Sequence, residues 1–95
     1  MRPSQALEAH REAIRRIVAE NHSSNPRVFG SVVYGEDSEG SDLDILVESS
    51  GMTLMDLAHI ENQLQDLMGI SVDVLTPGFL PPHLRDKVIS EAVPV

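Results

Sequence analysis

The sequence predicts a small α/β fold in which helices pack against a short β-sheet. Segments with apolar residues at helical spacing alternate along the chain with short runs in which every second residue is apolar. The chain has 95 residues, 41% of them hydrophobic, which is enough for one core and too little for two. We therefore expect residues 1–95 to form a single domain.

The first half of the chain predicts a helix, a strand and a helical turn. Residues 4–21 place apolar side chains at helical spacing, and the polar cluster 21–26, which closes on a proline, ends that helix. Residues 27–30 are typical of a short strand, and residues 31–35 of a helical turn. A polar, glycine-containing loop over 36–41 follows.

The segment 42–48 gives the strongest strand prediction. Because side chains alternate between the two faces of a strand, its apolar residues should share one face. These are Leu43, Ile45 and Val47, whereas Asp42, Asp44 and Leu46 should lie on the other face.

The second half predicts a helix, a strand and a final helix. Thr53 is a suitable N-cap for a helix that ends at Gly69, and 70–75 is typical of a strand. Pro81 and Pro82 can begin a last helix over about 82–92. Its apolar side chains, which we expect to be buried, are Leu84, Val88, Ile89 and Ala92.

Charge and composition exclude several classes of function. Seven basic against fifteen acidic residues give a net charge of −8, so we expect no direct binding to a nucleic-acid backbone. The absence of cysteine excludes thiol catalysis and zinc–thiolate sites. No apolar run has the length of a membrane span, and we expect a cytoplasmic protein.

Three aspartates within predicted strands are candidate metal ligands, because aspartate is disfavoured in strands. Asp42 and Asp44 share one strand face, with their Cβ atoms roughly 6.6 Å apart. Asp73 joins them if its strand pairs alongside in matching register. Oxygen-only ligands favour Mg²⁺, or Mn²⁺, over zinc. The alternative is that these aspartates are solvated strand-edge residues that discourage aggregation.

Gly30 and Ser31 lie where a strand gives way to a helical turn. A glycine allows close approach of a ligand to the backbone, and the first amides of a helical turn can bind phosphate. The alternative is an ordinary turn.

The spacing of these residues resembles a known signature. Ten residues separate Ser31 from Asp42, so the chain reads G-S-x10-D-x-D. This pattern is similar to that of the DNA polymerase β-like nucleotidyltransferases, and in particular to their minimal members, the MNT domains. The resemblance covers nearly the whole chain, including 28–31, 35–36, 41–47 and 72–76. The tail segments 80–85 and 91–93 are similar to MNT antitoxins encoded beside HEPN-domain toxins.

The resemblance implies a fold, a reaction and a set of roles. The fold is the polymerase β-like nucleotidyltransferase fold, a small mixed sheet flanked by helices. Gly30 and Ser31 would bind the nucleotide triphosphate, together with Asp42 and Asp44, which hold two Mg²⁺ ions. Asp73 would complete the metal site and help to activate the acceptor.

The resemblance also implies a partner. ATP would be the substrate, and its AMP would pass to a tyrosine of a cognate HEPN ribonuclease toxin, which is thereby neutralised in a hetero-oligomer. One departure from the family pattern is that many members carry arginine in the turn after Gly-Ser, where this chain has Val32, Val33 and Tyr34.

Two other functions stay open. The chain could neutralise its partner by steric capping, as a catalytically weak binding antitoxin, which the missing arginines favour. It could instead transfer a nucleotide to a small molecule such as an aminoglycoside.

Overall fold

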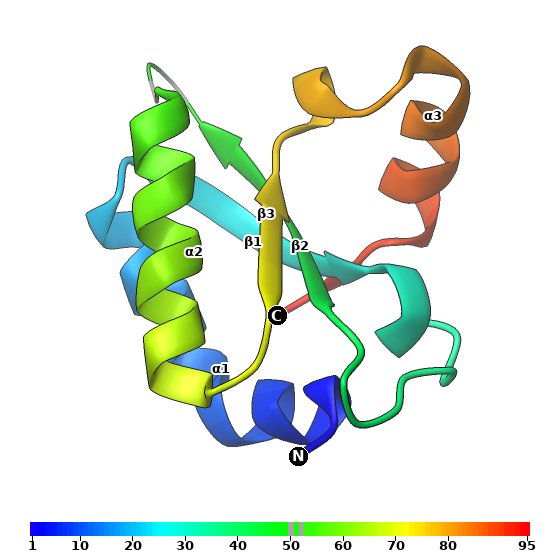
Figure 1. Ribbon diagram of the computed structural model, residues 1–95. Helices are drawn as coiled ribbons and strands as arrows, with labels where there is room; N and C mark the ends of the chain where they lie inside the picture. Colours follow the sequence, from blue (N-terminus) through cyan, green and yellow to red (C-terminus); the bar gives the residue numbers. More distant parts are fainter. Residues whose placement is uncertain (50, 52) are drawn as a thin grey trace.

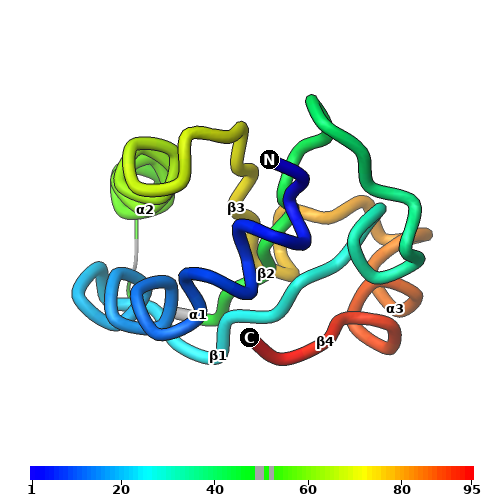
Figure 2. The backbone as a smooth tube through the Cα atoms, turned by 90° about the horizontal axis from the view of Figure 1, so that it is seen from below, coloured from blue at the N-terminus to red at the C-terminus, as the bar shows by residue number. Residues whose placement is uncertain are grey.

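The computed structural model describes residues 1–49, 51 and 53–95, which form a mixed sheet with helices on both sides (Figure 1). The strands are β1 (Ser23–Phe29), β2 (Leu43–Ser49), β3 (Val72–Leu75) and β4 (Val93–Pro94), and they lie in the order β3-β2-β1-β4. The helices are α1 (Pro3–Glu20), α2 (Leu54–Met68) and α3 (Pro82–Glu91), with short 3-10 turns η1 (Gly30–Val32) and η2 (Pro77–Phe79). Figure 2 shows α1 and α2 together on one side of the sheet and α3 on the other.

Strand pairing accounts for the mixed character of the sheet. β1 pairs antiparallel with both β2 and β4, whereas β2 and β3 run parallel because α2 forms the crossover between them. This confirms the predicted small mixed sheet flanked by helices.

The hydrophobic core lies between β2 and the two helices α1 and α2. The side chains of Leu43, Ile45 and Val47 are fully buried, as their alternation predicted. They pack in one cluster with apolar residues of α1 and α2, among them Ile14, Val18, Ile60 and Leu64. Burial of these side chains contributes roughly 1.5–3 kcal/mol each.

Helix α2 begins and ends where the sequence predicted. The Thr53 hydroxyl accepts from the Asp56 amide at 3.4 Å, and the Asp56 carboxylate accepts from the Thr53 amide at 2.9 Å. This reciprocal pair satisfies two free amides of the first turn. Gly69 ends the helix in the left-handed conformation, with φ +68°.

The first strand begins earlier than predicted. Residues 23–26, expected to be loop, belong to β1, and the register shifts between Ser24 and Arg27. His22 and Asn25 adopt positive φ values of 61° and 50°, which let a polar, proline-containing segment join the strand through a bulge. The short strand β4 was not predicted.

The prediction that α3 buries its apolar side chains is wrong. No residue of α3 is buried, and Leu84 and Ile89 are 43% and 39% exposed. The helix lies on the side of the sheet opposite α1 and α2 (Figure 2), and leaves much of its apolar surface open to solvent. No helix within the described parts of the chain combines the length and apolarity needed to cross a membrane.

Candidate active site

The register of the parallel strands brings two predicted site residues face to face. Asp44 in β2 lies directly opposite Asp73 in β3. The Leu43 amide donates to the Ser71 carbonyl at 2.9 Å, which fixes the start of this pairing. Neighbouring strands are about 4.8 Å apart, so the two carboxylates belong to one site.

Gly30 lies against the same carboxylate from the other side. Its predecessor Phe29 is the antiparallel partner of Asp44, and a Cβ atom on Gly30 would lie 2.3 Å from Asp44 Oδ2. Gly30 also has a φ of +80°, in the region that favours glycine. The close approach of this backbone to a carboxylate therefore requires glycine.

Negative charge is concentrated around Asp44. Partial burial, then the charge of Asp73 and then that of Asp42 raise the pKa of Asp44 to about 6. Asp42 lies just before β2, and Asp42 and Asp73 are exposed whereas Asp44 is half-buried. The charge of Asp42 thus reaches Asp44 although its own side chain faces solvent.

This group of carboxylates fits the chemistry of a divalent cation. Oxygen donors from aspartate are the preferred ligands of Mg²⁺, and a cation would relieve the repulsion that raises the pKa of Asp44. Among residues 1–49, 51 and 53–95, no three His, Asp or Glu side chains stand in a ready metal-binding cluster.

Helix α2 fixes the free edge of β3, and with it Asp73. The Val72 amide donates to Gln65 Oε1 at 3.0 Å, and the Val74 amide donates to Glu61 Oε1 at 3.1 Å. These side chains satisfy backbone amides that an edge strand would otherwise leave unpaired. Asp73 is therefore held on a strand whose two edges are both hydrogen-bonded.

The loop that carries Asp42 is fixed by an acid that the sequence analysis missed. Asp37 is only 8% exposed, and its Oδ2 accepts from the Ser4 amide at 3.0 Å, in the first turn of α1. That hydrogen bond lowers the pKa of Asp37. Farther along the loop, the Ser38 amide donates to Ser41 Oγ at 3.0 Å, next to Asp42. The only sequence signal was an acid in a polar loop, which gives no indication of its distant partner.

The turn η1 carries the second predicted element. Ser31 is half-buried directly after Gly30, and its carbonyl accepts from the Glu36 amide at 2.9 Å. The structure thus brings together Gly30, Asp44 and Asp73, with Ser31 and Asp42 each one or two residues away along the chain.

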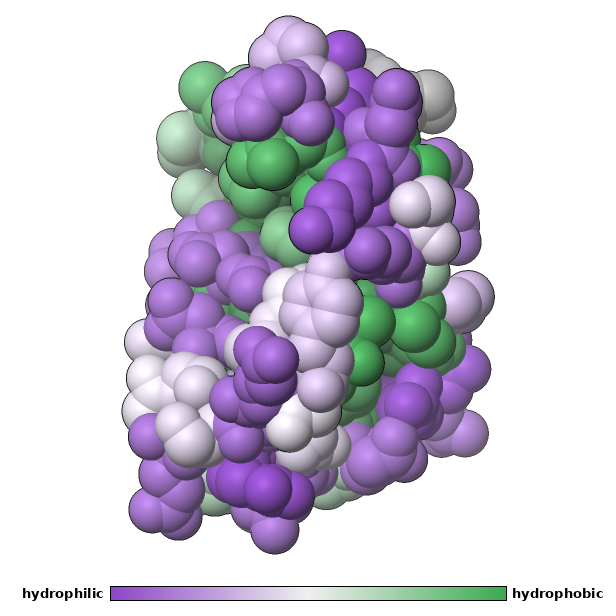
Figure 3. All heavy atoms as spheres, turned by 90° about the vertical axis from the view of Figure 1, so that its right-hand side faces the viewer, coloured by the Kyte–Doolittle hydropathy of each residue, from purple (hydrophilic) through white to green (hydrophobic). Residues whose placement is uncertain are grey.

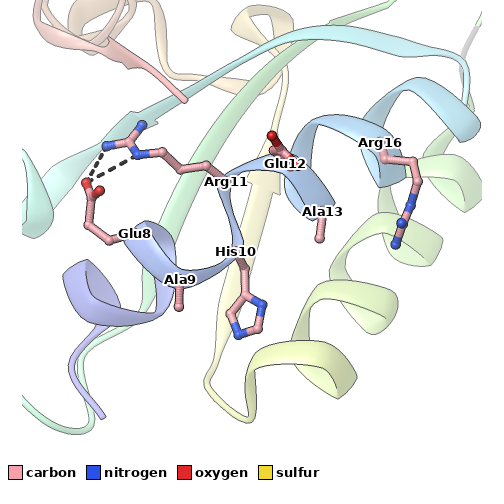
Figure 4. Close-up of a pocket in the computed structure, with 7 residues that line it drawn as sticks. All are labelled: Glu8, Ala9, His10, Arg11, Glu12, Ala13 and Arg16. Atoms are coloured by element: carbon pink, nitrogen blue, oxygen red, sulfur yellow. Dashed lines mark hydrogen bonds and ion pairs between the residues drawn. The ribbon is translucent and has the colours of Figure 1, made fainter.

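A separate hollow of about 660 Å³ lies on the outer side of α1 and contains none of these residues. It follows from a break in the helix at His10, whose φ of −128° and ψ of 21° are not helical. Figure 4 shows Arg11 paired with Glu8 on one side of the break, while His10 points away from that pair. The polar side chains that line this hollow do not converge on a common point (Figure 4). The carboxylate site is therefore the stronger candidate for the active site.

Comparisons with known proteins identify the family to which the sequence is similar. The sequence model of a family described as "Nucleotidyltransferase domain" matches residues 10–95. The chain is 44% identical over 69 residues to the "Putative protein adenylyltransferase MJ0435" of Methanocaldococcus jannaschii, which covers 72% of this chain and 74% of the relative.

Solved structures are similar over most of the chain. A structure described as a "putative minimal nucleotidyltransferase" superposes with a TM-score of 0.85 at 42% identity, covering 97% of this chain and 95% of the other. A second, described as "toxin-antitoxin with AMP-PNP", has a TM-score of 0.75 at 19% identity, covering 87% of this chain and 69% of the other. At that identity the second shows the fold alone.

Proposed function

Because this chain belongs to the nucleotidyltransferase domain family, we propose that it transfers AMP from ATP to a tyrosine of a partner toxin of the HEPN ribonuclease class, and so neutralises it. The observation that carries the proposal is the pairing of Asp44 with Asp73 against the backbone of Gly30. The name of the M. jannaschii relative supports adenylyl transfer to a protein, and the toxin–antitoxin neighbour with AMP-PNP supports the choice of partner and nucleotide.

Five residues would hold the reactants. Asp42, Asp44 and Asp73 would hold two Mg²⁺ ions, or Mn²⁺, and the backbone of Gly30 with the hydroxyl of Ser31 would bind phosphate oxygens of ATP. Bound there, the ions would neutralise phosphate charge and lower the pKa of the acceptor hydroxyl.

The transfer is a single displacement at phosphorus. The tyrosine oxygen forms a bond to the α-phosphorus, and the bond from that phosphorus to the bridging oxygen of pyrophosphate breaks. Asp73, which is exposed and opposite Asp44, accepts the tyrosine proton. Positioning and charge neutralisation supply most of the acceleration, as in other phosphoryl transfers.

The charge of the chain supports a basic protein partner. A net charge of −8 attracts a cationic protein, and an RNA-binding toxin has such a surface. The acceptor side of the site would then be completed by that partner.

Labelled ATP tests the proposal. The chain is incubated with ATP labelled at the α-phosphate, Mg²⁺ and the product of the neighbouring gene. We expect label on that product, loss of labelling in Asp42→Asn and Asp44→Asn, and normal labelling in Asp66→Asn, which changes an exposed aspartate of α2. Equal labelling by Asp44→Asn and the parent would contradict the proposal.

One observation favours steric capping as a second candidate. The turn after Gly30 carries Val32 and Val33, so no local arginine meets the phosphate charge. If capping is the mechanism, Asp44→Asn neutralises the toxin as well as the parent does, without any label on it.

A further inference from the structure

A groove of about 200 Å³ lies between the turn η1 and helix α3, and we call it the α3 groove. Its apolar lining is Phe29, Val33, Leu84 and Val88. The other side of the sheet is covered by two long helices, whereas this side has only α3, a helix without a fully buried residue. The α3 groove is therefore an apolar surface that the described chain leaves open.

Several segments around the groove carry exposed apolar side chains. Of the nine large hydrophobic side chains that are exposed in the described residues, five lie in η2, α3, β4 or the turn that follows η1. They are Tyr34, Phe79, Leu84, Ile89 and Val93, with exposures of 39–54%. Figure 3, which faces this side, shows hydrophobic patches separated by polar surface. Exposed apolar patches rimmed by polar residues are typical of protein-binding surfaces.

The α3 groove shares one residue, Gly30, with the carboxylate site. Gly30 lines the groove, and the same glycine lies against the Asp44 carboxylate. A segment seated between η1 and α3 would therefore contact the glycine that lies against Asp44, the partner of Asp73 across the β2–β3 pair.

The surroundings of the groove are acidic. The Tyr34 hydroxyl donates to the Glu91 carboxylate, and this hydrogen bond, with a smaller contribution from the charge of Glu36, raises the pKa of Tyr34. Lys87 is the one cationic residue that lines the groove among the described residues. Glu91 in the lining offsets Lys87, and Glu36 beside Tyr34 leaves a net negative charge at the groove, in a chain whose net charge is −8, so the occupant should be cationic.

We propose that the α3 groove is the docking site for a cationic segment of the acceptor protein, which inserts an apolar side chain between η1 and α3. The segment presents its acceptor tyrosine to the carboxylates beyond Gly30. This inference rests on the proposed adenylyl transfer to a protein, and adds where the acceptor binds and which chemistry recognises it.

The test uses a fluorescent random copolymer of lysine and tyrosine as the probe, with binding followed by anisotropy in the absence of ATP. Leu84→Lys places a charge in the groove. Leu67→Lys is the matched control, because Leu67 is a leucine of α2 with a similar exposure, 40% against 43% for Leu84. Both variants change the net charge equally, so nonspecific attraction to an acidic protein affects them alike.

We expect the parent to bind the lysine–tyrosine copolymer and not a glutamate–tyrosine copolymer. Leu84→Lys should weaken binding about tenfold, as for the loss of an interface anchor, and Leu67→Lys less than twofold. Equal weakening by the two variants, or no binding by the parent, overturns the proposal. A parent chain that dimerises in sedimentation while Leu84→Lys stays monomeric also overturns it, because the groove would then bind a second copy.

Labelling separates this inference from the function on which it rests. Adding Mg²⁺ and ATP labelled at the α-phosphate should label the copolymer with the parent and less with Leu84→Lys. Binding in the expected pattern without any label supports the groove and contradicts adenylyl transfer. Label that is equal for the parent and Leu84→Lys contradicts the groove and supports the transfer.

Discussion

Replacing Asp44 by asparagine should make the protein more stable near neutral pH while removing its activity. The pKa of Asp44 is about 6 in the folded chain against an ordinary value of 3.8, because burial and the charges of Asp73 and Asp42 oppose its ionisation. The unfolded chain ionises this group more easily than the folded chain does. The contribution of Asp44 to stability is therefore fully present below about pH 4 and is lost as the pH rises through about 6.

The size of the effect follows from these two pKa values. The gap between 3.8 and about 6 corresponds to about 3 kcal/mol at 1.36 kcal/mol for each pH unit. Because solvent reaches part of the Asp44 carboxylate, screening reduces the expected penalty to about 1–2 kcal/mol. Asparagine has the same shape without the charge, so Asp44→Asn should gain that amount.

Urea unfolding in EDTA measures the effect at pH 7.5 and at pH 4. We expect Asp44→Asn to exceed the parent by about 1–2 kcal/mol at the higher pH and by only a few tenths at the lower. Asp66→Asn, at an exposed position of α2, should change stability by less than about 0.5 kcal/mol at both. If Asp44→Asn gains no stability at pH 7.5, or gains the same amount at the two pH values, the pKa of Asp44 is not raised by burial and neighbouring charge as described.

Three further predictions concern the same site. Magnesium at ten times its dissociation constant should stabilise the parent by about 1.4 kcal/mol and leave Asp44→Asn unchanged in thermal unfolding; equal shifts would place the ion elsewhere. Gly30→Ala should lower stability by more than Gly40→Ala. Both glycines have positive φ, but only a Cβ atom at Gly30 would meet Asp44, at 2.3 Å from its Oδ2. Urea midpoints that fall equally in the two variants would contradict this contact. Asp37→Ala should lower the thermal midpoint because the Ser4 amide loses its acceptor. Since the pKa of Asp37 is lowered, the difference in midpoint between parent and variant should shrink as the pH falls below the ordinary pKa of aspartate. A pH-independent difference would argue against a charged cap.

Local patterns were sufficient to predict most of the elements. The alternation in 42–48 identified both the core face of β2 and the aspartates opposite it, because a strand has only two faces. Thr53 and Gly69 marked the ends of α2 because capping is a property of a few neighbouring residues. From the sequence, Asp73 could be placed beside Asp44 only if the two strands paired in matching register. The structure has that register.

Features that depend on distant partners were not predicted. The early start of β1 needs positive φ values at His22 and Asn25. Polar residues can adopt such values, but their presence in a sequence does not predict them. The burial of Asp37 depends on an amide 33 positions away. Leu84 has the spacing of a core residue, yet the described part of the chain leaves it 43% exposed.

A structure of the chain with Mg²⁺ and a non-hydrolysable ATP analogue would test the central claim most directly. We expect metal ions bound by carboxylate oxygens of Asp42, Asp44 and Asp73, with phosphate oxygens on Gly30 and Ser31. A nucleotide bound away from Gly30, or an Asp73 carboxylate turned away from the ions, would contradict it.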